Sequence, residues 1–219
     1  MKIIKPGYKI LTPINGLKEL RMIEYIGRTC YKSEDKISPD GESAKKFVKM
    51  LIDRGHEAML EHGHISVKFI VDRGVSHEIV RHRMASYAQE STRYCNYSKD
   101  KFGNEITFIE PCFWQDSEFE RENLYAEWYG LCQEAEDSYF ELIKYGATPQ
   151  QARAVLPNSL KTEVVMTANY REWRHFFKLR CDPAAHPQMR EVAIPLLQEL
   201  NKEIPVIFED LPFAEEQEV

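Results

Sequence analysis

The segment RHRMASYAQESTRY, residues 81–94, gathers basic and hydroxyl-bearing side chains in a short stretch of the chain. Arg93 offers a planar guanidinium fork suited to a phosphate or carboxylate, and Ser91 places a hydroxyl near it. Arg81 and Arg83 stand at the end of a predicted helix, where residues two apart diverge by about 200°, so they are expected to serve different partners, or one of them is structural. Composition alone leaves two interpretations open. The segment is either a solvated basic surface loop, because arginines are usually exposed, or a site for an anionic ligand.

The sequence around this segment alternates irregularly between helical and strand patterns. Periodicity predicts helices over residues 17–31, 44–52, 74–80, 117–145, 148–157, 171–179 and 190–204, and strands in the opening residues and over 64–71, 106–109 and 161–167. Ser43 is the expected N-cap of the second helix, and Pro195 is expected to kink or restart the last one. Residues 84–104 have no period, which predicts a long functional loop. Because strict strand–helix–strand units are lacking, the predicted fold class is α+β.

Length and composition limit the class of protein. A chain of 219 residues suits one domain, residues 1–219, that ends in an acidic tail at about residues 213–219. The net charge of −6 argues against a general nucleic-acid or membrane binder, so an anionic ligand requires a local basic cluster. No signal peptide or membrane span is recognisable. The five cysteines are scattered and odd in number, which fits a reduced, cytoplasmic compartment.

The stretch HEAMLEHGH, residues 56–64, is rich in potential metal ligands. A helical zinc protease motif needs histidines four residues apart, but Leu60 occupies the position four residues after His56. His62 and His64 can lie on one side of a strand, so a metal-dependent hydrolase built on His56, His62 and His64 stays open as an alternative. Polar contacts at a turn between a helix and a strand fit this spacing better than a metal site does.

The segment 81–94 resembles the signature of the flavin-dependent thymidylate synthases (the ThyX family), which is Arg-His-Arg, seven residues and Ser. Here the signature is Arg81-His82-Arg83, then MASYAQE, then Ser91, with Arg93-Tyr94 following. The resemblance extends from about Arg28 to Arg180, and four elements occur in matching order and spacing. The other three elements are His56-Glu57 with Glu61-His62, Arg153 before Leu-Pro, and Asn169-Tyr170-Arg171 with His175-Phe176 and Arg180.

This resemblance implies a fold and a reaction. The implied fold is the thymidylate synthase-complementing protein fold, a twisted, mostly antiparallel sheet flanked by helices. A Rossmann domain is not expected, because no G-x-G-x-x-G occurs. The implied reaction is the reductive methylation of dUMP to dTMP, with 5,10-methylenetetrahydrofolate as carbon donor and FAD, reduced by NADPH, as hydride carrier. No cysteine nucleophile is involved. The implied assembly is a homotetramer whose active sites are shared between subunits.

The resemblance also implies a role for individual residues. Arg180 is the expected catalytic residue, which supplies positive charge to the uracil ring. The expected FAD-binding residues are His56, Glu61, Arg81, His82, Arg83, Asn169, Arg171 and His175. The expected substrate-binding residues are Glu78, Gln89, Glu90, Ser91, Arg93, Tyr94, Arg153 and Arg180. Arg174, which shares a helix with Arg171 and Arg180, is expected to be structural.

The chain departs from the usual family pattern at a few positions. Ala88-Gln89 stands where the family commonly has Asn-Glu, and Glu78 stands where some members have Gln. Ala58 replaces a hydroxyl residue that is common after His-Glu. None of these changes removes a group that the chemistry requires. A non-enzymatic nucleotide- or RNA-binding domain that uses the same arginines and tyrosines is the alternative from another class.

Overall fold

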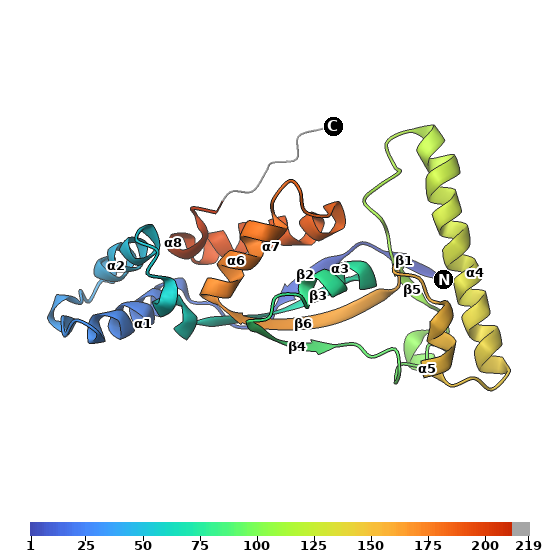
Figure 1. Cartoon of the computed structure of the whole chain (residues 1–219), viewed down its shortest axis with the longest axis horizontal. Helices are drawn as coiled ribbons and strands as arrows, with labels where there is room; N and C mark the ends of the chain where they lie inside the picture. The colour runs from blue at the N-terminus through green and yellow to red at the C-terminus, as the bar shows by residue number, and fades with distance from the viewer. Residues whose placement is uncertain (212–219) are drawn as a thin grey trace. The chain divides into compact units, whose positions relative to one another are not determined.

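The computed structural model describes residues 1–211, and the predicted acidic tail at about residues 213–219 lies outside the described residues (Figure 1). The largest sheet is antiparallel and has four strands in the order β2-β3-β6-β4. These strands are β2 (Gly7–Ile10), β3 (His64–Asp72), β6 (Lys161–Asn169) and β4 (Ala85–Gln89). Strands β1 (Lys2–Ile4) and β5 (Thr107–Ile109) form a separate parallel pair, with Ile3 opposite Phe108. The fold is therefore α+β with a mostly antiparallel sheet and helices, as predicted.

Strict alternation of side chains explains why the two long strands form. In β3, every second residue from Ile65 onward is buried, and in β6 the same holds from Thr162 onward. Successive side chains of a strand point to opposite faces, so this pattern gives each strand one face in the core. Both predicted strands, 64–71 and 161–167, are confirmed and are slightly longer than predicted.

Close contacts between residues group the chain into two compact units. Unit 1 comprises Met1–Gly7, Phe69–Arg81 and Tyr87–Val165, and unit 2 comprises Tyr8–Lys68, His82–Ser86 and the described part of Met166–Val219. The signature segment is divided between the units, because the boundary falls after Arg81 and again before Tyr87. The single domain predicted for residues 1–219 stays a prediction.

Unit 1 is built around the long helix α4 (Ala126–Lys144), which is preceded by a π-helical turn, η4 (Glu120–Tyr125). Its core contains Tyr97, Phe108 and Tyr139, all buried. The buried carboxylate of Glu136 accepts a hydrogen bond from the backbone N–H of Ile106 at 2.6 Å and pairs with the Met1 ammonium group at 2.8 Å. The other helical segments of unit 1 are α3 (Arg73–Ile79), η3 (Asp100–Phe102), α5 (Pro149–Ala152) and η5 (Arg153–Val155).

Unit 2 holds the other helices, and aromatic rings form much of its core. Its helical segments are α1 (Gly16–Thr29), η1 (Glu34–Lys36), α2 (Glu42–Asp53), η2 (Glu57–His62), α6 (Tyr170–Arg180), α7 (Pro187–Glu203) and α8 (Pro205–Phe208). On α6, Trp173, Phe176 and Phe177 are fully buried and contact one another. Helix α7 runs through Pro195 and is not divided there.

Two local predictions are wrong. Ser43 is not an N-cap, because α2 begins at Glu42 after Gly41, whose φ of +86° suits a glycine. Ser43 instead donates its hydroxyl to the buried carboxylate of Glu24 at 2.9 Å. The predicted loop over residues 84–104 contains strand β4 and the short helix η3. Strand β4 has no buried residue, so its sequence lacks the hydrophobic alternation that would have revealed it.

Across residues 1–211, no helix combines the length and the apolar character that crossing a membrane requires.

Candidate active site

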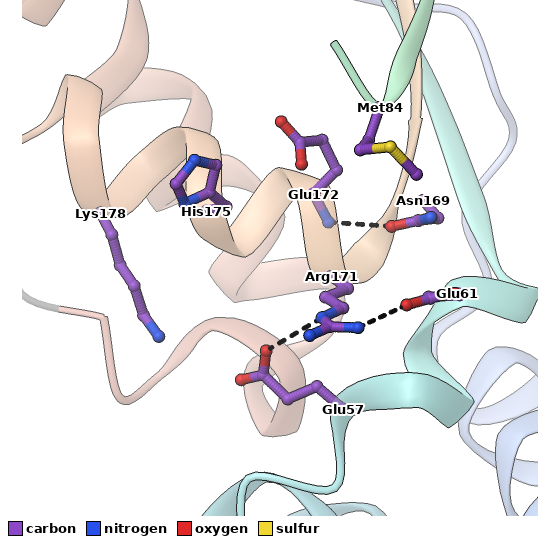
Figure 2. A pocket seen from close by; sticks show the side chains of 8 residues that line it. All are labelled: Glu57, Glu61, Met84, Asn169, Arg171, Glu172, His175 and Lys178. Atoms are coloured by element: carbon purple, nitrogen blue, oxygen red, sulfur yellow. Dashed lines mark hydrogen bonds and ion pairs between the residues drawn. The ribbon is translucent and has the colours of Figure 1, made fainter. Parts of the chain in front are cut away.

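A pocket of about 390 Å³ lies in unit 2 between η2 and α6, and we call it the α6 pocket (Figure 2). Its lining residues are Glu57, Glu61, Met84, Asn169, Arg171, Glu172, His175 and Lys178. Four of these, Glu61, Asn169, Arg171 and His175, were expected from the sequence to contact FAD. Asn169 fixes the start of α6, because its side chain accepts a hydrogen bond from the Glu172 backbone N–H at 2.8 Å.

Arg171 joins the two walls of the α6 pocket. Its Nη1 donates to the Glu61 carboxylate at 2.6 Å, and its Nε lies 4.0 Å from a Glu57 oxygen (Figure 2). The hydrogen bond with Glu61 raises the pKa of Arg171, and the charge of Glu61 adds to this shift. The Arg171 side chain is 55% exposed, so the guanidinium group can also meet a ligand in the pocket.

Arg180, His82 and Glu172 form a hydrogen-bonded row within unit 2. The Nε–H of Arg180 donates to Nε2 of His82 at 3.1 Å, and Nδ1 of His82 lies 3.1 Å from Oε1 of Glu172. Since Arg180 can only donate, Nε2 of His82 accepts, and the ring hydrogen resides on Nδ1 and points to Glu172. The row therefore holds His82 as a neutral ring of defined orientation.

Electrostatics favour the same state of His82. The ring is buried and lies against Phe176, with 4.9 Å between the ring centroids. Burial lowers the pKa of His82; the hydrogen bond to Glu172 opposes this shift, and the positive charge of Arg180 reinforces it. At neutral pH the positive charge of the row therefore belongs to Arg180.

The row also contains a possible group of metal ligands. Ligand atoms of His82, Glu172 and His175 lie within 4.8 Å of one another. However, Nε2 of His82 accepts a hydrogen bond from Arg180, whose charge opposes a cation at this position. In the described part of the chain, this is the single such group, and none of His56, His62 and His64 belongs to it. All three of these histidines are exposed, so the geometry gives the metal-dependent hydrolase no support.

Arg174 is a buried residue of α6 that supports one wall of the α6 pocket. Its side chain is 2% exposed, and it makes two hydrogen bonds to Asp210, at 2.6 and 2.7 Å, and one to the Ile207 carbonyl. Its Nε donates to Glu57 at 3.2 Å. Burial alone would lower the pKa of Arg174, but the hydrogen bonds and charges of Asp210 and Glu57 raise it overall. Arg174 is thus a structural residue that also fixes the carboxylate of Glu57.

A second pocket, of about 490 Å³, lies in unit 1, and we call it the Arg153 pocket. Its lining residues are Arg73, Thr92, Gln150, Arg153, Ala154, Leu156, Pro157, Asn158 and Leu160. Nη1 of Arg153 donates to the Thr92 hydroxyl at 2.9 Å. Thr92 lies between Ser91 and Arg93, so the expected substrate residues Ser91, Arg93 and Arg153 are brought to one region of unit 1.

Of the other expected substrate residues, Gln89 and Glu90 are engaged within unit 1 and Tyr94 is exposed on it. The Gln89 amide donates to the hydroxyls of Ser76, at 3.0 Å, and Thr162, at 3.4 Å. Glu90 forms an ion pair with Lys161 at 3.0 Å. Tyr94 is 77% exposed, and the Arg93 guanidinium lies over its ring at 5.5 Å.

Glu78, Arg81 and Arg83 are among the expected site residues that lie in neither pocket lining. Glu78 is half-buried on α3, Arg81 is exposed after it, and Arg83 is exposed in unit 2. His56 is absent from the lining of the α6 pocket and instead lines a further cavity of unit 2.

The polar residues of these sites that sequence reasoning missed include Glu57, Glu172, Lys178 and Thr92. Glu172 stands three residues after the N-cap Asn169, a spacing typical of a capping box, which by itself indicates only a local contact. Its carboxylate instead reaches His82, which is 90 positions away in the sequence. Thr92 lies inside the signature between two expected residues, and that position was the signal that could have revealed it.

The fold is α+β, and arginines line both the α6 pocket and the Arg153 pocket. Residues 15–206 match the family described as "Thymidylate synthase complementing protein". The chain belongs to this family, the ThyX family.

Curated relatives carry consistent names. The chain is 34% identical over 201 residues to a flavin-dependent thymidylate synthase of Corynebacterium aurimucosum, covering 86% of this chain and 78% of that protein. It is 31% identical over 204 residues to one of Mycobacterium avium, covering 88% and 80%. It is 32% identical over 205 residues to one of Mycobacterium tuberculosis, covering 86% and 78%.

Solved structures share the fold. The UMP/dUMP methylase PolB from Streptomyces cacaoi, bound with 5-Br UMP, superposes with a TM-score of 0.77 at 17% identity over 95% of each chain. The same protein bound with 5-Br dUMP gives 0.77 at 19% identity, over 95% of this chain and 96% of that one.

Proposed function

We propose that this protein converts dUMP to dTMP by reductive methylation, with 5,10-methylenetetrahydrofolate as carbon donor and FAD reduced by NADPH as hydride carrier. One structural observation supports the proposal in addition to family membership. His82 of the Arg-His-Arg signature contacts Arg180 of the downstream element, 98 positions away, in a row that also includes Glu172. Two elements that the family resemblance singles out thus converge on one hydrogen-bonded unit.

The α6 pocket suits the polar part of FAD. Arg171, His175 and Lys178 offer positive or hydrogen-bonding groups to a diphosphate. Lys178 forms no ion pair within the described residues, so its charge is available to a ligand. The carboxylates of Glu57 and Glu61 can accept hydrogen bonds from ribityl or ribose hydroxyls. When bound, the flavin supplies the hydride. The protein's residues bind and orient the ligands.

Arg180 is the proposed catalytic residue. Negative charge builds on the carbonyl edge of the uracil ring as carbon is added, and a fixed positive charge stabilises it. Neutral His82 holds the Nε of Arg180 in place, and Glu172 holds His82. A guanidinium group that is already oriented needs no reorganisation when the substrate charge develops.

The Arg153 pocket is the proposed site of the nucleotide phosphate. Arg153 and Arg93 supply charge, and the Ser91 and Thr92 hydroxyls supply hydrogen bonds. The Arg153–Thr92 bond orients the guanidinium group before the ligand arrives. Glu78, Gln89, Glu90 and Tyr94 stay predicted substrate-binding residues, as Arg81, Arg83 and His56 stay predicted FAD-binding residues.

A cysteine nucleophile is not part of the proposal. Burial raises the pKa of the Cys132 thiol to about 11 and that of Cys181 to about 12, so neither is a thiolate at neutral pH. No cysteine of the described chain lines the α6 pocket or the Arg153 pocket. We also propose the homotetramer with shared active sites, and a cytoplasmic location, both of which the resemblance supports.

Two measurements test the proposed function. Purified protein should be yellow or bind added FAD, and it should oxidise NADPH and release tritium from labelled dUMP when methylenetetrahydrofolate is present. UMP is assayed in parallel, because the PolB neighbour is described as acting on both nucleotides. A colourless protein that neither binds FAD nor releases tritium contradicts the proposal and favours a non-enzymatic nucleotide-binding domain.

A further inference from the structure

A third cavity, of about 640 Å³, lies in unit 2 beside helices α1 and α2, and we call it the α2 pocket. In Figure 1 these two helices run next to each other, and they pack together. The lining residues come from the end of α1, η1, α2 and the residue before η2: Arg28, Tyr31, Ser33, Lys36, Ser43, Lys46, Phe47, Met50, Leu51, Arg54 and His56. Nothing in the proposed function uses this pocket apart from His56.

The lining of the α2 pocket is strongly basic. Five of its eleven residues are Arg, Lys or His, and no carboxylate lines it. Lys36, Lys46 and Arg54 form no ion pair within the described residues, whereas Lys45 on the same helix pairs with Glu42 at 2.7 Å. The chain as a whole carries a net charge of −6. Positive charges gathered at one cavity of an acidic protein repel one another, and an anionic ligand relieves that repulsion.

The pocket also has an ordered aromatic wall. Arg28 lies over the Phe47 ring at 4.8 Å, and a Cβ at Gly27 would lie 2.6 Å from that ring. Only a glycine at position 27 allows this approach. Arg28 is held in turn by the fully buried carboxylate of Glu24, at 2.7 Å. The Phe47 ring thus packs between Gly27 and Arg28, and Tyr31, 72% exposed, offers a second ring in the lining.

We propose that the α2 pocket binds the part of a co-substrate that combines a planar ring with two or more negative charges. The inference rests on the proposed function, which requires two such molecules. NADPH carries an adenosine with a 2′-phosphate and a diphosphate, and the folate carries an aminobenzoyl ring with a glutamate dianion. The ring would stack on Phe47 or Tyr31, as planar rings do on aromatic and guanidinium faces. The anionic groups would meet Lys36, Lys46 and Arg54.

Its position supports a role in the same reaction. His56 lines the α2 pocket, and the next residue, Glu57, lines the α6 pocket. A ligand held by the α2 pocket thus lies against the segment that forms one wall of the proposed flavin site.

The test is direct binding of two fragments to the purified full-length protein. 2′,5′-ADP represents NADPH, and p-aminobenzoylglutamate represents the folate; each is titrated calorimetrically at low and high salt. One fragment should bind, more weakly at high salt. The double variant Lys46→Ala/Arg54→Ala should weaken that fragment about tenfold or more, because it removes two charged contacts. The matched variant Lys45→Ala should leave its affinity unchanged.

The two fragments distinguish NADPH from the folate as the ligand of the α2 pocket. The controls distinguish loss of binding from loss of folding. Weakening confined to 2′,5′-ADP assigns the pocket to the reductant, and weakening confined to p-aminobenzoylglutamate assigns it to the folate. Binding of neither fragment, or equal weakening by Lys45→Ala, overturns the inference. The replaced side chains are exposed, so the urea midpoint should not move. Because fragment binding is measured without turnover, a failure of the proposed reaction is detected separately, by flavin content and tritium release.

Discussion

Arg180 donates its Nε hydrogen to Nε2 of His82 across 3.1 Å, and this bond leaves the imidazole neutral and the guanidinium charged. A histidine that accepts from an arginine cannot also be protonated at that nitrogen without repelling it. The pair therefore behaves as one cationic group whose orientation His82 sets. Its chemistry suggests direct tests.

Arg180→Ala should lower kcat about 100-fold or more and leave most FAD bound, because the lost charge acts on the developing charge of the substrate. Tritium release and flavin absorbance of the purified variant measure the two effects. Arg180→Lys is the control, since it keeps a positive charge but has no Nε–H to donate to His82. Loss of FAD in proportion to activity would assign Arg180 to flavin binding instead.

The lowered pKa of His82 makes stability depend on pH. Below the ordinary pKa of about 6.5, the unfolded chain binds a proton at this residue and the native protein does not. The free energy of unfolding should therefore fall as the pH decreases from about 6.5, until the lower native pKa is reached. Urea unfolding at pH 8, 7, 6 and 5 measures this slope. His82→Gln should flatten it, and identical slopes for both proteins would contradict the shift.

Arg174 and Arg171 provide a matched pair on helix α6. Arg174→Met leaves Asp210 and Glu57 without their buried partner, and breaking such a pair costs about 3–5 kcal/mol. Arg171→Met removes an ion pair at the surface and should cost far less. Urea unfolding measures the loss of stability in each variant. The loss of bound FAD should be larger in Arg171→Met than in Arg174→Met. Equal destabilisation would mean that the burial of Arg174 does not determine its contribution.

Arg153→Ala should raise the KM for dUMP about 10- to 100-fold, because a charge-assisted hydrogen bond to the phosphate is lost. Thr92→Val should have a smaller effect, since the charge stays and only its orientation is lost. Arg121→Ala is the control in the same unit, where the side chain is exposed and donates to the Gln115 carbonyl. An equal rise in the KM for dUMP in Arg121→Ala and Arg153→Ala would contradict the assignment of the phosphate to the Arg153 pocket.

Gly63→Ala should destabilise the protein by about 1–3 kcal/mol, because the added methyl group would overlap the buried ring of Tyr170. Gly130→Ala, in the middle of α4 with nothing within 4 Å, should stabilise it by about 0.5–1 kcal/mol. Thermal unfolding of both variants checks the opposite signs. If Gly63→Ala is neutral, the contact between Gly63 and Tyr170 is looser than described.

The sequence predicts best where one residue pattern decides one structure. The alternation in β3 and β6 and the aromatic stripe of α6 are visible because burial of a single face leaves a period. The signature Arg81-His82-Arg83 with Ser91 is recognisable because basic and hydroxyl-bearing residues cluster there. The periodic features were sufficient to predict the α+β class. The family resemblance singled out Glu61, Asn169, Arg171 and His175, which line the α6 pocket and stay predicted FAD-binding residues.

The sequence does not reveal contacts between residues that are far apart along the chain. Nothing near Glu172 indicates that its carboxylate meets His82, and nothing near Thr92 indicates that it accepts a hydrogen bond from Arg153. Strand β4 is hidden for another reason: none of its residues is fully buried, so ladder hydrogen bonds rather than burial define it. Tertiary geometry, not local propensity, decides these features.

Because His56 and Glu57 are neighbours in the chain, they connect two cavities. The two residues line different cavities, so a shift of this short segment on filling one cavity would also move a wall of the other. Two ligands that bind there would then be thermodynamically coupled. Linkage requires that each change the equilibrium affinity of the other by the same factor. Cooperativity between flavin and co-substrate would thus follow from a short 3₁₀ helix of six residues, with no movement of the sheet.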